Sequence, residues 1–412
     1  MSPRPTKGHH HKRSQGASRP QLPTITATKW CTGCSACVAV CDKRAAISMQ
    51  PDKEGFLIPQ VDCTRCNQCG KCYRKCPSAQ LEQGKAQLSP GHLSPFVSEQ
   101  TQPSFKPSYF ALSLKPDFKN LYGCATTGAA FRISYAFIKS GGLVCGCRFN
   151  YESAEAEHAI ASTVDELKAF CGSKYVQSNK NDVMAQVRAH LRAGRKVLFI
   201  GTPCEVSGLK QLLTDKEQEQ LFTIDLICHG VPDPQSLKLY LKDLSSQIGP
   251  VHDLNFRAER WEPLIFQAQG SKGSFKAVAN NTHYFFAFMQ NLHLRPSCYH
   301  CPYASITRVG DLTLGDFWGV QHFIKNFPYP EAGVSGAIVS NEKGAALINT
   351  LHNHTRNVCE VSAELMQATN ISLRQPASTS QPAREFYYQE RDHTQSVVAS
   401  VNAVIARFGK KA

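Results

Sequence analysis

The sequence predicts a small α+β domain followed by a larger α/β domain whose sheet is mostly parallel or mixed. Three observations support this prediction. Cysteines gather in two matching runs between residues 31 and 77, which indicates one compact module near the N-terminal end. A polar stretch with several prolines follows this module. Beyond that stretch, apolar runs of strand length alternate with helical patterns, which is typical of an α/β domain.

The length of 412 residues allows two or three domains and at least one large core. We expect the domain boundaries to lie where the composition changes. The expected parts are a basic disordered tail at 1–27, the small domain at 28–80, a linker or extended wrap at 81–107, the larger domain at 108–390 and a C-terminal helix or tail at 391–412.

The chain carries 46 basic and 32 acidic residues, a formal net charge of +14, and 42% of its residues are apolar. Six of the basic residues stand in the first 30 positions, where no acidic residue occurs. Because this tail is short and rich in Pro, Ser and Gly, we interpret it as a disordered extension rather than a nucleic-acid site. No apolar run is long enough to span a membrane, and the basic start lacks the apolar segment of a secretion signal. We therefore expect a cytoplasmic chain with no membrane span and no nucleic-acid partner.

The 18 cysteines are the most informative feature of the composition. In a secreted protein they would suggest disulfides, but the chain is long and shows no export signal. Nearly half of the cysteines stand in CxxC spacing, which favours metal ligation.

The two cysteine runs are one motif written twice, and the motif is that of bacterial two-cluster ferredoxins. The two-residue gaps let a tight loop direct three thiolates at one cluster, and the fourth cysteine points to the other cluster. The sequence therefore predicts a ferredoxin-like module with two [4Fe–4S] clusters; zinc and disulfides are the alternatives. The predicted ligands are Cys31, Cys34, Cys37 and Cys76 for one cluster and Cys66, Cys69, Cys72 and Cys41 for the other.

Residues 45–62, between the two runs, read as a β-hairpin with its turn around Asp52–Gly55. Cys63 is out of frame with both runs, so we interpret it as a bystander thiol near the second cluster rather than a ligand.

Two units of the larger domain read as strand, turn and helix. In the first, the strand covers Lys196–Ile200 and the turn ends at Cys204; in the second, the strand ends at Ile227 and Cys228 follows it. Such strands usually lie parallel, and ligands bind beyond their carboxyl ends, so Cys204 and Cys228 should face one crevice.

A third segment, "LRPSCYHCPYA", adds the pair Cys298 and Cys301. Four thiols from three segments could then converge on one metal centre. Spacing alone leaves other interpretations open, because cysteine is often a small buried apolar residue and a lone CxxC can bind zinc or act as a redox pair. We interpret the remaining cysteines of this domain as packing residues: Cys124, Cys145, Cys147, Cys171 and Cys359.

Nearly the whole chain from Cys31 onward resembles the coenzyme F420 hydrogenase/dehydrogenase beta subunit family, in its bacterial form with an N-terminal ferredoxin domain. The segments that carry the resemblance are "TTGAAFRISYAFIKSGGLVCGCRF", "CGSKYVQS", "VLFIGTPCEVSGLK", "DLICHGVPDP", "NFRAERW", "LRPSCYHCPYA" and "GDLTLGDFWGV".

This resemblance implies FAD and one further [4Fe–4S] cluster in the larger domain, the latter on Cys204, Cys228, Cys298 and Cys301. Lys174 would pair with a phosphate or with reduced flavin, and Asp316 would cap a turn or hold a ribose hydroxyl. The alternatives are a surface lysine and a plain turn. The implied cofactor-binding residues are Thr127, Gly128, Lys174, Tyr175, Gly201, Thr202 and Asp316.

The resemblance implies an oxidoreductase that moves electrons between a ferredoxin-type redox partner and an organic two-electron substrate through FAD, with coenzyme F420 as one possible substrate. His158 and His229 are candidate proton donors, and a structural role is the alternative for each. Two rival interpretations are a ferredoxin-like electron carrier or adaptor without its own substrate, and a zinc-stabilised binding module.

Overall fold

The computed structural model describes residues 25, 30–41, 44–95, 105–115, 124–259, 261–327 and 333–409. Apart from Ile25, the tail expected at 1–27 lies outside the described residues. Within these ranges, no helix combines the length and the apolar character that a membrane crossing requires.

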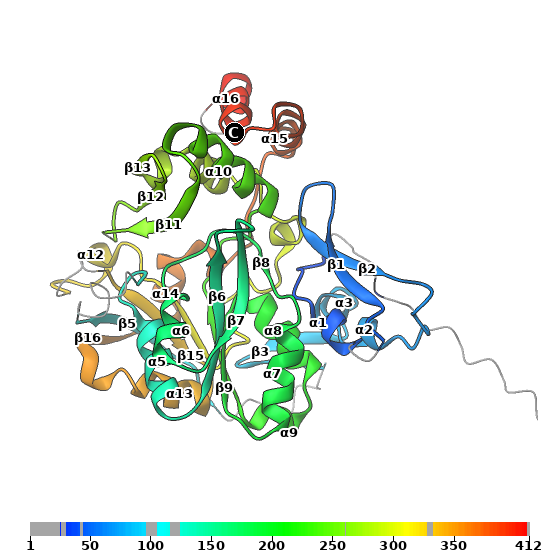
Figure 1. Ribbon diagram of the computed structural model, residues 1–412. Coiled ribbons are helices and arrows are strands. Elements are labelled where there is room, and N and C mark those ends of the chain that lie inside the picture. The colour runs from blue at the N-terminus through cyan, green and yellow to red at the C-terminus, as the bar shows by residue number, and fades with distance from the viewer. Residues whose placement is uncertain are drawn as a thin grey trace, which may run out of the picture.

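A mixed sheet forms the centre of the larger domain (Figure 1). Within the described residues it has nine strands in the order β16-β5-β15-β14-β10-β9-β6-β7-β8. The central strands β6, β9, β10 and β14 pair in parallel, whereas β14–β15, β15–β5, β16–β5 and β6–β7 are antiparallel. The predicted mixed α/β sheet is therefore confirmed. The strand bounds are β5 Ser108–Leu114, β6 Leu143–Asn150, β7 Glu155–Ala161, β8 Ser178–Asn179, β9 Val197–Gly201, β10 Leu221–Leu226, β14 Leu312–Asp316, β15 Ser335–Val339 and β16 Thr355–Val361.

Helices cover both faces of this sheet, and successive side chains of β9 contact helices on opposite faces. Val197 and Phe199 pack with helices α7 (Val183–Arg192) and α8 (Pro203–Leu212). Leu198 and Ile200 pack on the opposite face with α5 (Ala129–Lys139) and α13 (Glu342–Asn349). A strand buried on both faces reads as a continuous apolar run, which is the pattern of "VLFI". The short helices α6 (Val164–Lys168), α9 (Asp215–Glu219) and α12 (Val320–Phe323) lie in connections.

A second layer stands at one end of the sheet, at the top of Figure 1. Its core is rich in aromatic side chains, including Tyr240, Phe266, Tyr284 and Phe285. The segment 391–412, expected as a helix or tail, holds the last residues of α15 and the whole of α16 in this layer. The layer consists of β11 Val251–Ala258, β12 Ile265–Gly270, β13 Gly273–Val278, α10 Pro234–Ile248, α11 His283–Met289, α15 Gln381–Thr394 and α16 Val397–Phe408.

The N-terminal cysteine-rich module contains short helices and an antiparallel strand pair. Strands β1 (Ile47–Pro51) and β2 (Leu57–Val61) confirm the predicted hairpin, and the Asp52 carboxylate accepts from the backbone N–H groups of Glu54 and Phe56 at 2.9 Å each. The stretch expected as a linker also holds a hairpin, of β3 (Ala86–Ser89) and β4 (His92–Pro95). The helices of this module are α1 Ala36–Val40, α2 Lys71–Arg74 and α3 Pro77–Glu82. The remaining helix, α14 Ala363–Thr369, belongs to the larger domain.

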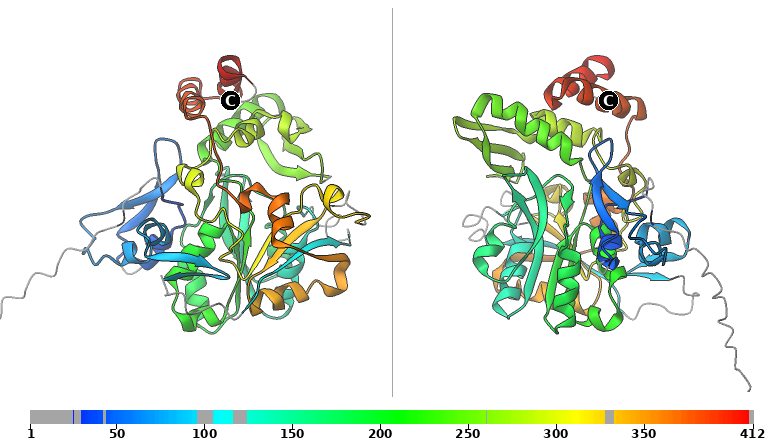
Figure 2. Two further views of the ribbon diagram at one scale, coloured as in Figure 1. Left: turned by 180° about the vertical axis from the view of Figure 1, so that it is seen from behind. Right: turned by 45° about the vertical axis from the view of Figure 1, so that its right-hand side comes forward.

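The module is docked directly on the larger domain, and both views in Figure 2 show it beside α7 and α8. The Arg295 guanidinium donates to the carbonyl oxygens of Cys31 and Leu57, at 2.8 Å each. Arg384 reaches the tip of the β1–β2 hairpin, where it donates to both carboxylate oxygens of Glu54 at 2.9 and 2.5 Å. Because these cations are buried and paired across the boundary, the docking is specific.

Candidate functional site

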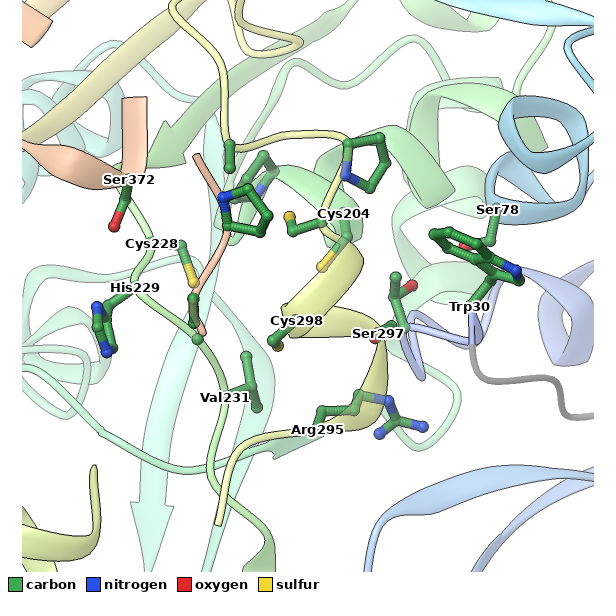
Figure 3. Close-up of a pocket in the computed structure, with 18 of the residues that line it drawn as sticks. Trp30, Ser78, Cys204, Cys228, His229, Val231, Arg295, Ser297, Cys298 and Ser372 are labelled. Carbon is green, nitrogen blue, oxygen red and sulfur yellow. The ribbon is translucent and has the colours of Figure 1, made fainter. Parts of the chain in front are cut away.

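Four cysteines from three segments line one cavity of about 250 Å³ (Figure 3). Cys204 is the second residue of α8, Cys228 follows β10 by two positions, and Cys298 and Cys301 belong to the turn that begins at Pro296. Strands β9 and β10 are parallel, so the residues after them lie at the same edge of the sheet. The structure therefore brings together the four thiols that the sequence singled out.

The four thiols share a buried environment and act on one another electrostatically. Burial raises the pKa of Cys228 well above its usual value, and the nearby thiols of Cys298, Cys204 and Cys301 raise it further. Burial also raises the pKa of Cys298 to about 12, with Cys301 as the next cause. Four thiolates would repel one another here unless a positively charged centre neutralised them, and an iron–sulfur cluster bound through its irons provides such a centre.

Within the described part of the chain, no three or more Cys, His, Asp or Glu side chains converge as a single metal ion requires. In a four-iron cluster each thiolate binds a different iron atom, so its ligands stand farther apart than those of one ion. The four thiols at the cavity therefore do not form a compact single-ion site among the described residues.

Two buried arginines flank the CxxC pair. Arg295 and Arg308 are each 2% exposed. Arg308 lies 3.5 Å from Asp225 and donates to the carbonyl oxygens of Tyr303 and Leu226, and its charge lowers the pKa of Cys301 against the larger effect of burial. Both cations stabilise negative charge on nearby sulfur.

The two N-terminal loops have the same local geometry. The residue before the second cysteine of each run has a positive φ (Gly33 67°, Gln68 52°), and so has the residue after it (Ser35 64°, Gly70 66°). The repeated motif thus folds as a repeated loop, which buries Cys34 in the first run and leaves Cys69 exposed in the second.

The thiols of the two N-terminal runs also interact across the module. The pKa of Cys76 is raised to about 12 by burial first and then by Cys34 and Cys31, which belong to the first run. Among the groups that raise the pKa of Cys72 is Cys41, the last thiol of the first run. Cys76 of the second run therefore lies near the first run, and Cys41 of the first run lies near the second.

The N-terminal module also borders the cavity. Trp30, Thr32 and Ser78 line it together with the four cysteines, and Figure 3 shows Trp30 and Ser78 on the opposite side from His229. A Cβ atom added to Gly208, one turn after Cys204 on α8, would lie 2.7 Å from the Cys34 sulfur. The backbone of α8 and the first N-terminal thiol set are therefore in close contact.

The turn at the start of α5 lies apart from the cavity lining and uses positive φ angles. Thr126 (49°) and Gly128 (74°) are both left-handed, and the Thr127 hydroxyl is 2.6 Å from the Ser335 hydroxyl. Lys174 donates to the carbonyl oxygen of Cys171 at 2.7 Å, and burial lowers its pKa. Lys174 is therefore not the surface lysine of the alternative interpretation.

Asp316 belongs to a network that the sequence reasoning missed. Its carboxylate receives two hydrogen bonds of 2.9 Å from Arg257, one of 3.0 Å from the Trp261 indole and one from the Thr126 hydroxyl. Tyr175 lies against this group, since its pKa responds to the charge of Arg257 after the larger effect of burial. Arg257 and Trp261 belong to the segment "NFRAERW", which is part of the family resemblance, but no role was predicted for their side chains.

Gly201 and Thr202 lie next to Cys204. The Thr202 backbone N–H donates to the Glu205 carboxylate at 2.8 Å, and its hydroxyl is 3.2 Å from the Cys204 sulfur. A Cβ atom at Gly201 would stand 2.7 Å from Glu205 Oε2, so close packing against this carboxylate explains the glycine.

The two candidate histidines differ in their surroundings. His158 is buried, with its Nδ1 2.6 Å from the Ser178 hydroxyl and its Nε2 3.1 Å from the Ile200 carbonyl, and burial lowers its pKa to about 4. These contacts favour the structural alternative. His229 lines the cavity beside Cys228, and its Nε2 is 2.6 Å from Asn291 Oδ1.

Comparisons with known proteins agree with this division of the chain. Residues 194–363 match the family model for the C-terminal part of the coenzyme F420 hydrogenase/dehydrogenase beta subunit, and residues 30–80 match that of the 4Fe-4S dicluster domain. Among solved structures, the chain is similar to a chain of the F420-reducing [NiFe] hydrogenase complex from Methanosarcina barkeri, with 12% identity and a TM-score of 0.44 over 72% of this chain and 96% of that one. No curated protein matches.

The cavity cysteines all fall inside the first matched range, and the eight cysteines of the repeated motif fall inside the second. The chain is therefore related to the coenzyme F420 hydrogenase/dehydrogenase beta subunit through residues 194–363, as an iron–sulfur electron-transfer protein that carries a 4Fe-4S dicluster domain in the same polypeptide.

Proposed function

We propose that the chain is a flavin- and iron–sulfur-dependent oxidoreductase. It moves electrons between a redox partner protein, such as a ferredoxin, and an organic two-electron substrate through FAD. The convergence of Cys204, Cys228, Cys298 and Cys301 on one cavity beside the N-terminal thiol module carries this proposal. An electron carrier alone would have no use for such a second thiol site.

The N-terminal module, which we propose is ferredoxin-like, holds two clusters. When bound, each cluster supplies a one-electron redox centre. The chain's own residues set the ligand positions through the left-handed loops and bury the thiols of Cys34, Cys37 and Cys72. The proposed ligands are Cys31, Cys34, Cys37 and Cys76 for the first cluster and Cys66, Cys69, Cys72 and Cys41 for the second.

We propose that the cavity cysteines hold a third [4Fe–4S] cluster. Arg295 connects the two regions, since it lines the cavity and donates to the Cys31 carbonyl. The buried Tyr303 also lies between them, because Cys204, Cys34 and Cys301 all raise the pKa of its hydroxyl after burial itself. Short separation and an interior without bulk water favour electron passage from one region to the other.

FAD is assigned to the α/β domain, where it supplies hydride and single-electron chemistry when bound. The glycine turn at the start of α5 and the buried Lys174 support this assignment, because backbone N–H groups and a cation suit an anionic cofactor. The Asp316 carboxylate already accepts hydrogen bonds from Arg257 and Trp261, so it would hold these side chains in place rather than bind ribose itself. The proposed contacts are Thr127, Gly128, Lys174, Tyr175, Gly201 and Thr202, and Asp316 acts on the site by holding Arg257 and Trp261.

Coenzyme F420, which the family description names, is the first substrate to test. Of the two candidate proton donors, His229 is the better placed, because it lines the cavity whereas His158 is held at both ring nitrogens.

Cofactor content of the anaerobically purified chain tests the proposal. Three four-iron clusters predict about twelve irons per chain together with FAD. Replacing Cys298 and Cys301 with Ala should remove about four irons and leave the remaining two clusters' spectra in place. Cys359→Ala is the matched control, since this thiol lies on β16 at the far edge of the sheet. About eight irons and no flavin in the parent chain would instead support the carrier or adaptor.

A further inference from the structure

Two cysteines outside the cavity and the N-terminal module face each other. The sulfur atoms of Cys124 and Cys171 are 3.4 Å apart, although 47 positions separate the residues in sequence. The sequence alone predicts no more than a packing role for either. A sulfur–sulfur contact this short lies within reach of a covalent bond after a small side-chain rotation, since a disulfide needs about 2.05 Å.

The two thiols differ in exposure and in acidity. Cys124 is 4% exposed, whereas Cys171 is only partly buried. The contact with the Cys124 thiol lowers the pKa of Cys171, and the charge of Lys174 lowers it further against the effect of burial. The pKa of Cys124 is raised by the same contact and by burial. The accessible thiol is therefore also the more nucleophilic one.

A lysine holds this arrangement in place. Lys174 Nζ donates to the backbone carbonyl oxygens of Cys171 and Gly172 at 2.7 and 3.2 Å. The ammonium group is thereby fixed beside the thiol that it activates. An accessible thiol of lowered pKa with a second thiol in contact is the arrangement of a nucleophilic and a resolving cysteine.

We propose that Cys124 and Cys171 form a reversible disulfide by exchange with a low-molecular-weight disulfide such as oxidised glutathione. The Cys171 thiolate attacks one sulfur of that disulfide, which breaks the S–S bond, forms a mixed disulfide and releases one glutathione thiolate. The Cys124 thiol then loses its proton and attacks the Cys171 sulfur, which releases the second glutathione. Two cysteines are oxidised, and one molecule of oxidised glutathione is reduced to two of glutathione.

This disulfide would join two segments of the chain. A Cβ atom at Gly128 would lie 3.3 Å from the Cys124 Cβ, so Cys124 packs directly under the turn that starts α5. Cys171 leads into the segment that contains Lys174. Under the proposed function both segments contact FAD, so oxidation would fix the distance across the flavin site. That consequence rests on the proposed function, whereas the disulfide itself does not.

Peptide mapping of the anaerobically purified full chain tests the proposal. The protein is treated with oxidised glutathione, free thiols are alkylated, and tryptic peptides are analysed without reduction. The expected product links residues 120–132 to residues 169–174 in most molecules, and dithiothreitol reverses it. Modification of the exposed Cys63 serves as the internal control for reagent activity. If Cys63 is modified while no linked peptide forms, or if Cys171 is linked to the 140–148 peptide that holds Cys147, the proposal is overturned.

Single serine variants test the order of the two steps. Cys124→Ser should stop at a mixed disulfide of glutathione with Cys171, whereas Cys171→Ser should leave the buried Cys124 unmodified. The reverse pattern would contradict the assigned roles. If the variants do not fold, the linked peptide of the parent chain still decides the proposal. Flavin content measured on the same sample keeps the two hypotheses separate, since a chain without FAD refutes the proposed function but leaves the disulfide test intact.

Discussion

The contact between Gly208 and Cys34 predicts how firmly the N-terminal module is held. An alanine Cβ at position 208 would lie 2.7 Å from the Cys34 sulfur and 2.9 Å from its Cβ, where ordinary contact begins at 3.4 Å. The module must therefore move away by about 0.7 Å, and overpacking of this kind costs about 1–3 kcal/mol. Alanine also favours the helix over glycine by about 1 kcal/mol. The cost of overpacking is larger than the gain in helix propensity, so Gly208→Ala should weaken docking of the module by about 1 kcal/mol.

A loss of that size raises the population of the undocked module by about fivefold, because each 1.4 kcal/mol is a factor of ten. Iron transfer to a chelator under anaerobic conditions measures this population if docking is rapid compared with extraction. Gly273→Ala is the matched control, since a Cβ atom there meets nothing within 4 Å. Gly208→Leu should release iron faster still. Parent-like iron release in both Gly208 variants would refute direct contact between α8 and the first thiol set.

Three further changes have defined outcomes. Arg384→Met leaves the Glu54 carboxylate without its cation, and breaking a buried ion pair costs about 3–5 kcal/mol. Hydrogen exchange in the β1–β2 hairpin should therefore rise. Arg374→Met, a change at an exposed position, should not raise it. Burial lowers the pKa of His158 to about 4. The neutral imidazole therefore contributes fully to folding stability above pH 6.5, and this contribution is lost as the pH falls through 4. His158→Gln should flatten the acid side of the plot of unfolding free energy against pH, measured by denaturation. Lys174→Met should lower flavin retention without lowering iron content, and equal loss of both would contradict a local role.

Local spacing predicted the elements of this molecule better than it predicted their contacts. The repeated cysteine motif determines its own loops, because the ligand positions are two or three residues apart. The parallel strands β9 and β10 were readable as apolar runs, so the meeting of Cys204 with Cys228 followed from strand order. The hairpin of β3 and β4 was missed, because its polar sequence lacks strand periodicity.

Contacts between distant segments could not be predicted from any window of the sequence. Nothing near Gly208 indicates that Cys34 packs on it, and nothing near Cys124 points to Cys171. The network of Arg257 and Trp261 around Asp316 likewise depends on how the second layer meets the sheet. Such pairs are specified by packing of the whole chain, not by local propensity.

Helix α8 carries Cys204 at its start and contacts Cys34 through Gly208 one turn later, about 6 Å along the axis. A freely diffusing carrier must find its acceptor at a rate that depends on its concentration and on salt. In the proposed pathway a single turn of helix would replace that encounter, so internal electron delivery should show first-order kinetics that neither dilution nor ionic strength alters. The collisions left in the proposed pathway are those with the organic substrate and with the external redox partner, and only the second would make turnover respond to the concentration of another protein.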